Sequence, residues 1–349
     1  MVEENKDIKN MTLAEIGELV EGFGQKKYLA KYIYGFIHVK DAREISDLST
    51  LSKQFRDELV EKGYYISEIK LVEKLEDPDG TKKYLFELGD GLKIESVLLF
   101  DDSRRTLCIS TQVGCWMGCG FCATAKLGFT RDLSAAEIVD QVNFVSKDEC
   151  RVSNVVYMGM GEPLNNYENV IKSIEILNCS AGKNLGIRHI TVSTCGVADG
   201  IEKLADEELK PRLAVSLNAP VDAIRSSIMP VNKKFKLAYL FKALKDYQFK
   251  TGNRVTFEYV MIKDVNDSND NLDQLIRLVR TVKCNVNLIE YNPHQGCDFL
   301  PSSRATIKDF AKKMQNEGIE TTIRLKMGQT IKGACGQLGA DRIASEKKV

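Results

Sequence analysis

The sequence predicts an α/β protein in which a partial, TIM-like (β/α)6 barrel follows a small helical domain and a β-strand extension. Three observations support this fold class. Residues up to about 65 have the apolar spacing of helices, strand spacing begins near residue 66, and strands and helices alternate after residue 106. Such alternation is typical of a parallel sheet. The expected parts of the chain are 1–65, 66–105, 106–340 and a tail at 341–349.

The first part should consist of short helices. Thr12 and Glu15 have the spacing of a capping box ahead of LAEIGELV, so a helix should begin there. Two further stretches carry apolar residues at three- and four-residue steps, KYLAKYIYGFI (27–37) and LSKQFRDELVEKGYY (51–65). We therefore expect three helices in this domain.

The extension should contain three strands joined by tight turns. Its apolar runs are ISEIKLVEKL (66–75), TKKYLFEL (81–88) and LKIESVLLF (92–100). The turn sequences DPDG (77–80) and GDG (89–91) separate these runs.

The barrel should have six strands with its functional site at their carboxyl ends. Ser134 and Glu137 form a second capping box, at the start of the first barrel helix. The expected helices include 134–145, 167–177 and 271–282, and the expected strands are 107–111, 155–159, 189–193, 213–217, 256–262 and 287–291.

Charge and hydropathy restrict the class of protein. The chain has 49 basic and 49 acidic residues, so the total charge gives no sign of a nucleic-acid partner, although a local basic face is compatible with one. No apolar run approaches the roughly 18 residues of a membrane span, and MVEENKDIKN is not a signal peptide. We expect a cytoplasmic monomer without membrane association. Basic clusters occur at Lys26–Lys27–Lys31, Lys233–Lys234–Lys236 and Lys312–Lys313.

Three clustered cysteines indicate a metal site. Cytosolic cysteines are normally reduced, and the three histidines of the chain are far apart, which argues against a histidine-based zinc site. Cys115, Cys119 and Cys122 follow the first barrel strand with no fourth cysteine nearby. This spacing suits a 4Fe–4S cluster with one iron left open. A zinc site completed by a distant cysteine and a chance spacing are the alternatives.

The same residues resemble a known family. CxxxCxxC after a first barrel strand, with Phe121 before the third cysteine, resembles the radical S-adenosylmethionine (SAM) enzymes. MGMGEP (158–163) is similar to their glycine-rich segment, which receives the ammonium group of SAM. The resemblance narrows to the RlmN/Cfr family of RNA adenine methylases over about residues 12 to 340. It is carried by 107–133, 158–170, 190–196, 213–220, 228–234, 287–293 and 333–338.

This resemblance implies a reaction and its partners. It implies one 4Fe–4S cluster, two SAM molecules per turnover and an electron donor such as flavodoxin or ferredoxin. The implied substrate is an adenosine in the peptidyltransferase region of 23S rRNA, methylated at carbon 2, with an anticodon-adjacent adenosine of tRNA as a second substrate. Methylation at carbon 8, as in Cfr, is the alternative within the family. A non-catalytic zinc protein that binds RNA and a radical enzyme acting on a peptide are alternatives from other classes.

Three catalytic residues follow from the resemblance. Cys335, in GACGQL, matches the cysteine that is first methylated and then forms a covalent link to RNA. Cys108 matches the cysteine that releases this link by forming a disulfide with Cys335. Glu95 matches the proposed proton acceptor, although a glutamate on a strand usually faces solvent.

The implied SAM contacts come from several strand ends. Asn218 stands where the family often has histidine, and Glu290 where many RlmN members have proline. GMGEP and FTRDL favour the RlmN type. The implied contacts are Gly161, Glu162, Ser193, Ser216, Leu217, Asn218 and Asn292.

Some features receive no catalytic assignment. The helical domain, with its lysines and tyrosines, is the expected RNA-contacting module. Trp116 lies between cluster ligands and either shields the cluster or fills the loop. Five cysteines match no functional position and are expected to be structural or incidental: Cys150, Cys179, Cys195, Cys284 and Cys297.

Overall fold

The N-terminal helices form as the sequence predicts. The computed structural model describes residues 6–101, 103–149, 151–324 and 326–341, so Cys150 and most of the expected tail lie outside the described residues. The capping box forms at the first helix, because Thr12 accepts from the Glu15 amide and Glu15 accepts from the Thr12 amide. The elements are η1 (Ile8–Asn10), α1 (Leu13–Gly22), α2 (Leu29–His38), η2 (Ile45–Asp47) and α3 (Lys53–Glu61).

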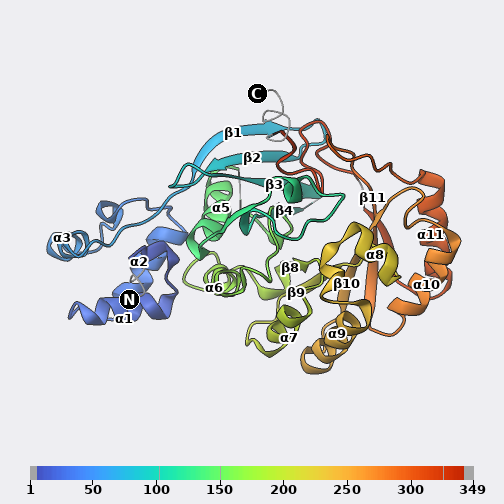
Figure 1. Ribbon diagram of the computed structural model, residues 1–349. Coiled ribbons are helices and arrows are strands. Elements are labelled where there is room, and N and C mark those ends of the chain that lie inside the picture. The colour runs from blue at the N-terminus through green and yellow to red at the C-terminus, as the bar shows by residue number, and fades with distance from the viewer. Residues whose placement is uncertain (1–5, 102, 150, 325, 342–349) are drawn as a thin grey trace.

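The β-extension is continuous with the barrel sheet. Its strands β1 (Lys70–Glu76), β2 (Lys82–Glu87) and β3 (Lys93–Asp101) pair antiparallel, and β3 pairs in the same way with β4 (Arg104–Cys108). Figure 1 shows these strands arching over one end of the molecule, with the C-terminal segment beside them. The extension therefore reaches the carboxyl end of the barrel.

The barrel strands run parallel in the order β4-β7-β8-β9-β10-β11-β12. The six expected strands are present, as β4, β7 (Asn154–Tyr157), β8 (Ile190–Thr194), β9 (Arg212–Ser216), β10 (Val255–Met261) and β11 (Cys284–Glu290). The structure adds a seventh, β12 (Thr321–Arg324), which pairs with β11. Its sequence, TTIR, is short and mostly polar, so it lacks the apolar run by which the other strands were predicted.

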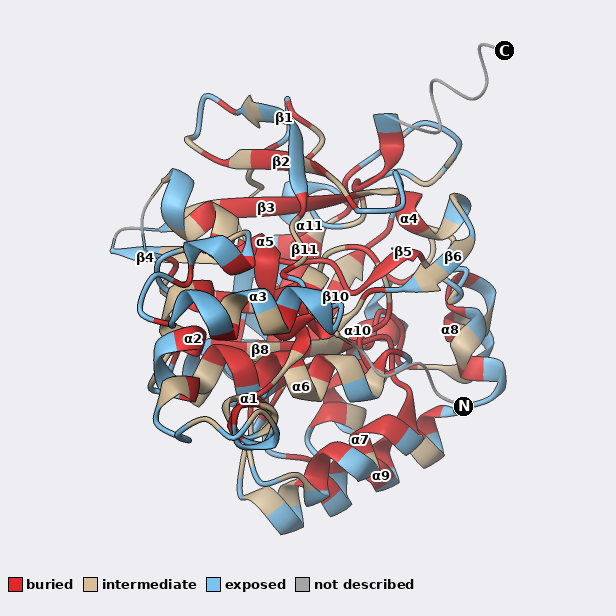
Figure 2. Cartoon of the chain, turned by 90° about the vertical axis from the view of Figure 1, so that its left-hand side faces the viewer, coloured by how far each residue is buried: buried red, intermediate tan, exposed pale blue. Residues whose placement is uncertain are grey.

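Helices follow the strands and cover the outside of the sheet. Ser134 caps the first of them in the second predicted capping box. Figure 2 shows the buried residues concentrated in the strands and on the inner sides of these helices. The helices are α5 (Ala135–Asp148), α6 (Tyr167–Asn178), η3 (Ile187–His189), α7 (Ala198–Asp206), α8 (Asp222–Ile228), η4 (Pro230–Lys233), α9 (Leu237–Thr251), α10 (Asn269–Val279) and α11 (Arg304–Asn316).

A small ribbon and a one-turn helix flank the segment with the three cysteines. The ribbon pairs β5 (Gln112–Gly114) with β6 (Phe129–Asp132), and α4 (Ala123–Lys126) precedes β6. Gly114 has φ of 79°, and a Cβ atom there would lie 1.8 Å from the Gly128 carbonyl oxygen. Only glycine fits this approach, so the ribbon depends on that residue.

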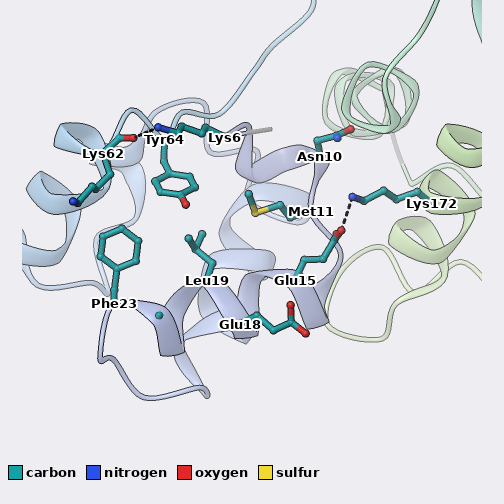
Figure 3. A pocket seen from close by; sticks show the side chains of 11 residues that line it. Lys6, Asn10, Met11, Glu15, Glu18, Leu19, Phe23, Lys62, Tyr64 and Lys172 are labelled. Carbon is teal, nitrogen blue, oxygen red and sulfur yellow. Dashed lines mark hydrogen bonds and ion pairs between the residues drawn. The ribbon is translucent and has the colours of Figure 1, made fainter. Parts of the chain in front are cut away.

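Ion pairs join the N-terminal helices to the barrel. Lys9 Nζ lies 2.7 Å from Asp140 Oδ1 of α5, and both side chains are buried. Lys172 of α6 reaches Glu15 of α1 at 2.7 Å. Figure 3 shows this second pair at the edge of a cavity of about 700 Å³ whose apolar lining includes Leu19. No helix in the described part of the chain is long and apolar enough to cross a membrane.

The buried pair gives a stability prediction. Lys9→Met leaves the Asp140 carboxylate buried without its cation and should lower the free energy of unfolding by about 3–5 kcal/mol. Lys27→Ala removes the exposed Lys27–Glu21 pair and should cost less than about 1 kcal/mol. Urea denaturation followed by circular dichroism measures both. Equal losses in the two variants would contradict a special role of the buried pair.

Candidate active site

The carboxyl ends of the barrel strands gather the residues that the sequence singled out. Gly161 and Glu162 follow β7, Ser193 lies in β8, and Ser216 ends β9. Asn292 follows β11 by two residues. Because parallel strands present their carboxyl ends at one face of a barrel, these residues share that face.

The glycine-rich segment packs against the loop after β4. A Cβ atom on Gly159 would lie 2.6 Å from the Ile109 carbonyl oxygen, and one on Gly161 would lie 2.6 Å from Gln112 Cβ. Gly161 also has φ of 105°. The glycines therefore permit a close approach between two protein segments.

Glu162 is held rigidly in the interior. Its Oε2 accepts from the Cys195 amide at 2.8 Å, and its Oε1 accepts from the Leu164 amide. Its own amide donates to Gln112 Oε1 at 2.8 Å. Burial raises the pKa of Glu162, and these amide donors oppose the rise. The side chain thus fixes the ends of β7 and β8 relative to each other.

The segment with the three cysteines is anchored from three directions. The Cys115 amide donates to the Gly128 carbonyl at 2.7 Å, and the Gly120 amide donates to Ile228 at 2.9 Å. The Ala123 amide donates to the Gly336 carbonyl at 2.8 Å. We call residues 115–123 the cluster loop.

Burial disfavours the charged form of the three thiols. Burial, then the neighbouring thiols and Glu162, raise the pKa of Cys119 well above its usual range. Burial also raises the pKa of Cys115 to about 12. Buried thiolates need positive charge beside them, which iron supplies.

Their arrangement differs from that of a single-ion site. Within the described residues, no group of three His, Cys, Asp or Glu side chains is placed to hold one metal ion. Thiolates that bind different irons of a cluster need not converge on one point. Three cysteines on one short loop match the three-thiolate ligand set of a 4Fe–4S cluster with one open iron.

Arg225, which the sequence did not single out, joins the strand ends. Its side chain is fully buried. It donates to the carbonyls of Cys195 at 2.6 Å, Ser216 at 3.1 Å and Leu217 at 3.0 Å, and to Asn232 Oδ1 at 3.0 Å. An arginine in VDAIRSSIM gives no local signal of burial, because arginines usually face solvent.

Asn218 forms hydrogen bonds with other residues of the protein. Its Oδ1 accepts from the Val260 amide at 2.8 Å, and its carbonyl accepts from Asn266 Nδ2 at 2.7 Å. The residue has φ of 55°, a left-handed conformation that asparagine tolerates. Its side chain therefore joins the segment after β9 to β10.

Cys335 lies on a loop without regular secondary structure that many hydrogen bonds hold in place. Asn292 Nδ2 donates to the Cys335 carbonyl at 3.2 Å, and Thr124 Oγ1 donates to Leu338 at 2.9 Å. We call residues 326–341 the catalytic loop. Cys335 itself is exposed, so its thiol is accessible to a large substrate.

Carboxylates of the β-extension hold the other side of the catalytic loop. Asp77 Oδ2 accepts from the Thr330 amide and hydroxyl, and Asp79 Oδ2 accepts from the Gly328 amide at 2.8 Å. These aspartates belong to the predicted turn DPDG. The turn thus positions the catalytic loop as well as joining two strands.

Glu95 is buried and faces the catalytic loop. Its Oε2 accepts from the Gly339 amide at 3.1 Å and lies 3.9 Å from Lys83 Nζ. Lys83 in turn pairs with Asp341 at 2.9 Å. The general expectation that a strand glutamate faces solvent does not hold here, because Lys83 and the catalytic loop enclose it.

Cys108, Cys335 and Arg324 share one electrostatic neighbourhood. Burial and then Cys335 raise the pKa of Cys108 to about 12, while Arg324 opposes the rise. Cys335 chiefly raises the pKa of Arg324, and Glu258 and Cys108 add to this. Both thiols are free in this structure. Arg324, on the unpredicted strand β12, was missed by sequence reasoning.

Arg324 also borders the interior of the barrel. It lies 3.6 Å from Glu258 Oε2 and helps to line a cavity of about 580 Å³. Arg188 and Arg212, near the amino ends of β8 and β9, line the same cavity. The lining of this cavity is therefore polar and carries more basic than acidic side chains.

Two of the five cysteines without an expected role contact the site. The backbone of Cys195 bonds Glu162 and Arg225, and Cys297 Sγ lies 3.3 Å from the Gly120 carbonyl oxygen in the cluster loop. Cys179 and Cys284 are half-buried.

Comparisons with known proteins agree with this geometry. The sequence profile of the Radical SAM superfamily matches residues 109–278. The probable dual-specificity RNA methyltransferase RlmN of Clostridium novyi is 42% identical over 335 residues, which cover 95% of this chain and 97% of that protein. The dual-specificity RNA methyltransferase RlmN of Geotalea uraniireducens is 44% identical over 335 residues, covering 96% and 97%. The crystal structure of a radical SAM methyltransferase from Sphaerobacter thermophilus matches with a TM-score of 0.90 at 40% identity, covering 96% of this chain and 99% of that one.

Arg225 provides a test of how the site is built. Arg225→Met leaves three buried carbonyls and Asn232 Oδ1 without their donor, so the free energy of unfolding should fall by about 3 kcal/mol or more. Because Arg225 joins β8 to β9, SAM affinity should fall as well. Urea denaturation and calorimetric titration with SAM measure the two effects.

The exposed Arg277 on α10 is the matched control. Arg277→Ala should change stability by less than about 0.5 kcal/mol. An Arg225→Met protein as stable as this control would contradict the role inferred for Arg225.

Proposed function

Because the chain belongs to the RlmN family of radical SAM RNA methyltransferases, we propose that it methylates carbon 2 of an adenosine in RNA. The proposed substrates are the peptidyltransferase region of 23S rRNA and an anticodon-adjacent adenosine of tRNA. One observation above all supports this proposal: the loop that carries Cys335 bonds Glu95 through the Gly339 amide, bonds Ala123 through the Gly336 carbonyl and interacts electrostatically with Cys108.

The chain's own residues would hold both cofactors. Cys115, Cys119 and Cys122 would bind three irons of a 4Fe–4S cluster and leave the fourth for SAM. When bound, these groups supply the methyl group and the radical chemistry that an electron-poor aromatic carbon requires. Gly161, Glu162, Ser193, Ser216 and Asn292 would surround SAM. Leu217 and Asn218 would contribute through their backbone, since the Asn218 side chain is engaged with Val260.

Cys335 would carry the methyl group before its carbon reaches adenine. Its exposure makes it accessible both to SAM and to a base turned out of the RNA. The covalent link between Cys335 and RNA must then be broken. Cys108 would attack the sulfur of Cys335 as a thiolate and break its bond to the bridging carbon, which keeps the electron pair and takes up a proton to become the methyl group of the released RNA. The two cysteines are left as a disulfide, which an external thiol reduces.

Glu95 would accept the proton that leaves the adenine ring. Lys83 at 3.9 Å and the Gly339 amide place positive charge and a donor beside its carboxylate. Because Glu95 is buried, water is excluded, and its carboxylate is the base available to accept the proton of the adenine ring.

The N-terminal helices are the proposed RNA-contacting module. Tyr28 and Tyr32 are 56% and 50% exposed and pack edge to face on α2. Lys26 and Lys31 are exposed beside them. Aromatic and basic side chains together suit unpaired nucleotides, and affinity for RNA should fall with salt. We propose flavodoxin or ferredoxin as the electron donor and a monomer as the working state.

Mass spectrometry of cellular RNA tests the proposed reaction. The gene should restore 2-methyladenosine to 23S rRNA in a strain that lacks this modification, and to tRNA if the second substrate is correct. Finding 8-methyladenosine would establish the alternative position on the ring. Finding no methylated adenosine in either RNA would refute the proposed function.

Variants of the two cysteines separate their roles. Cys335→Ala should abolish methylation and keep the visible absorbance of the cluster, because it removes only the methyl carrier. Cys108→Ala should accumulate protein linked covalently to RNA, visible as a slow band on denaturing gels. Cys284→Ala, at a half-buried cysteine of β11 away from the site, should behave like the parent protein. Normal turnover by either of the first two variants would contradict the assigned roles.

A further inference from the structure

Trp116 is the single tryptophan of the chain, and it is exposed although it lies between two cluster ligands. Its side chain is 68% exposed. Large aromatic side chains are usually much more buried than this. Most of the Trp116 side chain therefore faces solvent.

The indole ring has a fixed position. It stacks on the Phe129 ring of β6, with centroids 4.9 Å apart and an interplanar angle of 29°. Gly114 pairs with Phe129 across the ribbon, and the Cys115 amide bonds the Gly128 carbonyl. Trp116 is thus presented by a rigid ribbon, which lowers the entropic cost of binding a flat ligand.

Exposed lysines lie on two elements next to the cluster loop. The Gly120 amide donates to the Ile228 carbonyl at the end of α8, and a Cβ on Gly118 would lie 3.5 Å from Pro230 of η4. Figure 2 shows α4, β5, β6 and α8 along one flank of the molecule. Lys233 in η4 and Lys126 in α4 are exposed, and neither forms an ion pair within the described residues. An exposed aromatic ring on a loop whose neighbouring elements carry exposed lysines suits a nucleotide.

The loop that carries Trp116 also contacts the catalytic loop. At its other end the Ala123 amide donates to the Gly336 carbonyl at 2.8 Å, next to Cys335 in the sequence. A nucleotide bound on Trp116 would therefore contact the loop that adjoins the catalytic loop.

We propose that Trp116, supported by Phe129, is a stacking site for an unpaired base of the RNA substrate, with Lys126 and Lys233 beside its phosphates. This inference rests on the proposed function. Stacking of one base on an aromatic side chain corresponds to a change of about 5- to 150-fold in dissociation constant.

The test uses the enzyme with its cluster and a fluorescently labelled hairpin from the peptidyltransferase region of 23S rRNA. Anisotropy under anaerobic conditions should show RNA binding weakened at least fivefold in Trp116→Ala. Trp116→Phe, which keeps a flat ring, should bind within about threefold of the parent. Phe249→Ala, at a 92% exposed aromatic residue on α9, should bind like the parent. Iron content should be equal in all four proteins.

Tryptophan fluorescence, excited at the red edge of the protein spectrum where the 12 tyrosines absorb little, gives an independent measurement, because the chain has a single tryptophan. RNA should quench it in the parent protein with the same midpoint as the anisotropy change. Unchanged affinity in Trp116→Ala, or RNA binding without quenching, would overturn the stacking site and leave the proposed function intact. Slower cluster reduction by flavodoxin at unchanged RNA affinity would overturn it in favour of an electron-donor surface. A parent protein that binds no RNA would overturn both proposals.

Discussion

The position of Cys335 depends on hydrogen bonds between loops, since no helix or strand carries this residue. In the β-extension, the carboxylates of Asp77, Asp79 and Glu95 accept hydrogen bonds from backbone amides of the catalytic loop. A hydrogen bond from the cluster loop holds the catalytic loop on its other side. Charge-assisted bonds of this kind are stronger and more directional than neutral ones. The antiparallel extension therefore has a clear physical purpose: it brings fixed acceptors to the carboxyl end of the barrel.

Buried charge recurs where the site must be rigid. Arg225 joins the ends of β8 and β9 through three carbonyls, Glu162 joins β7 to β8 through amides, and Lys83 lies between Glu95 and Asp341. Each group has lost its contact with water and needs all its partners at once. Such networks tolerate little displacement, and this suits chemistry in which a methyl carbon must approach one ring atom.

The sequence correctly predicted the structural elements that depend on a local pattern of residues. Both capping boxes and six barrel strands formed, because side-chain spacing and apolar runs determine them. Strand β12 was missed because TTIR has no apolar run. The burial of the Arg225 side chain was missed because its partners are loop carbonyls. Glu95 meets an amide 244 positions away, which no window of sequence can show. The candidate catalytic cysteines were identified by family resemblance alone, because a single thiol has no local sequence pattern that marks it as reactive.

Helix α5 connects the two regions on which substrate recognition would depend. Asp140 binds Lys9 and the Ile69 amide on the side of the N-terminal helices. The next residue, Gln141, bonds Ser96 and both backbone groups of Ser110, two positions beyond Cys108. Consecutive residues of the stiff helix α5 thus contact both the N-terminal region and the barrel. If the N-terminal helices bind RNA as proposed, α5 holds these RNA contacts at a fixed distance from the barrel. An adenosine is then accepted when the folded RNA around it can reach both places at once.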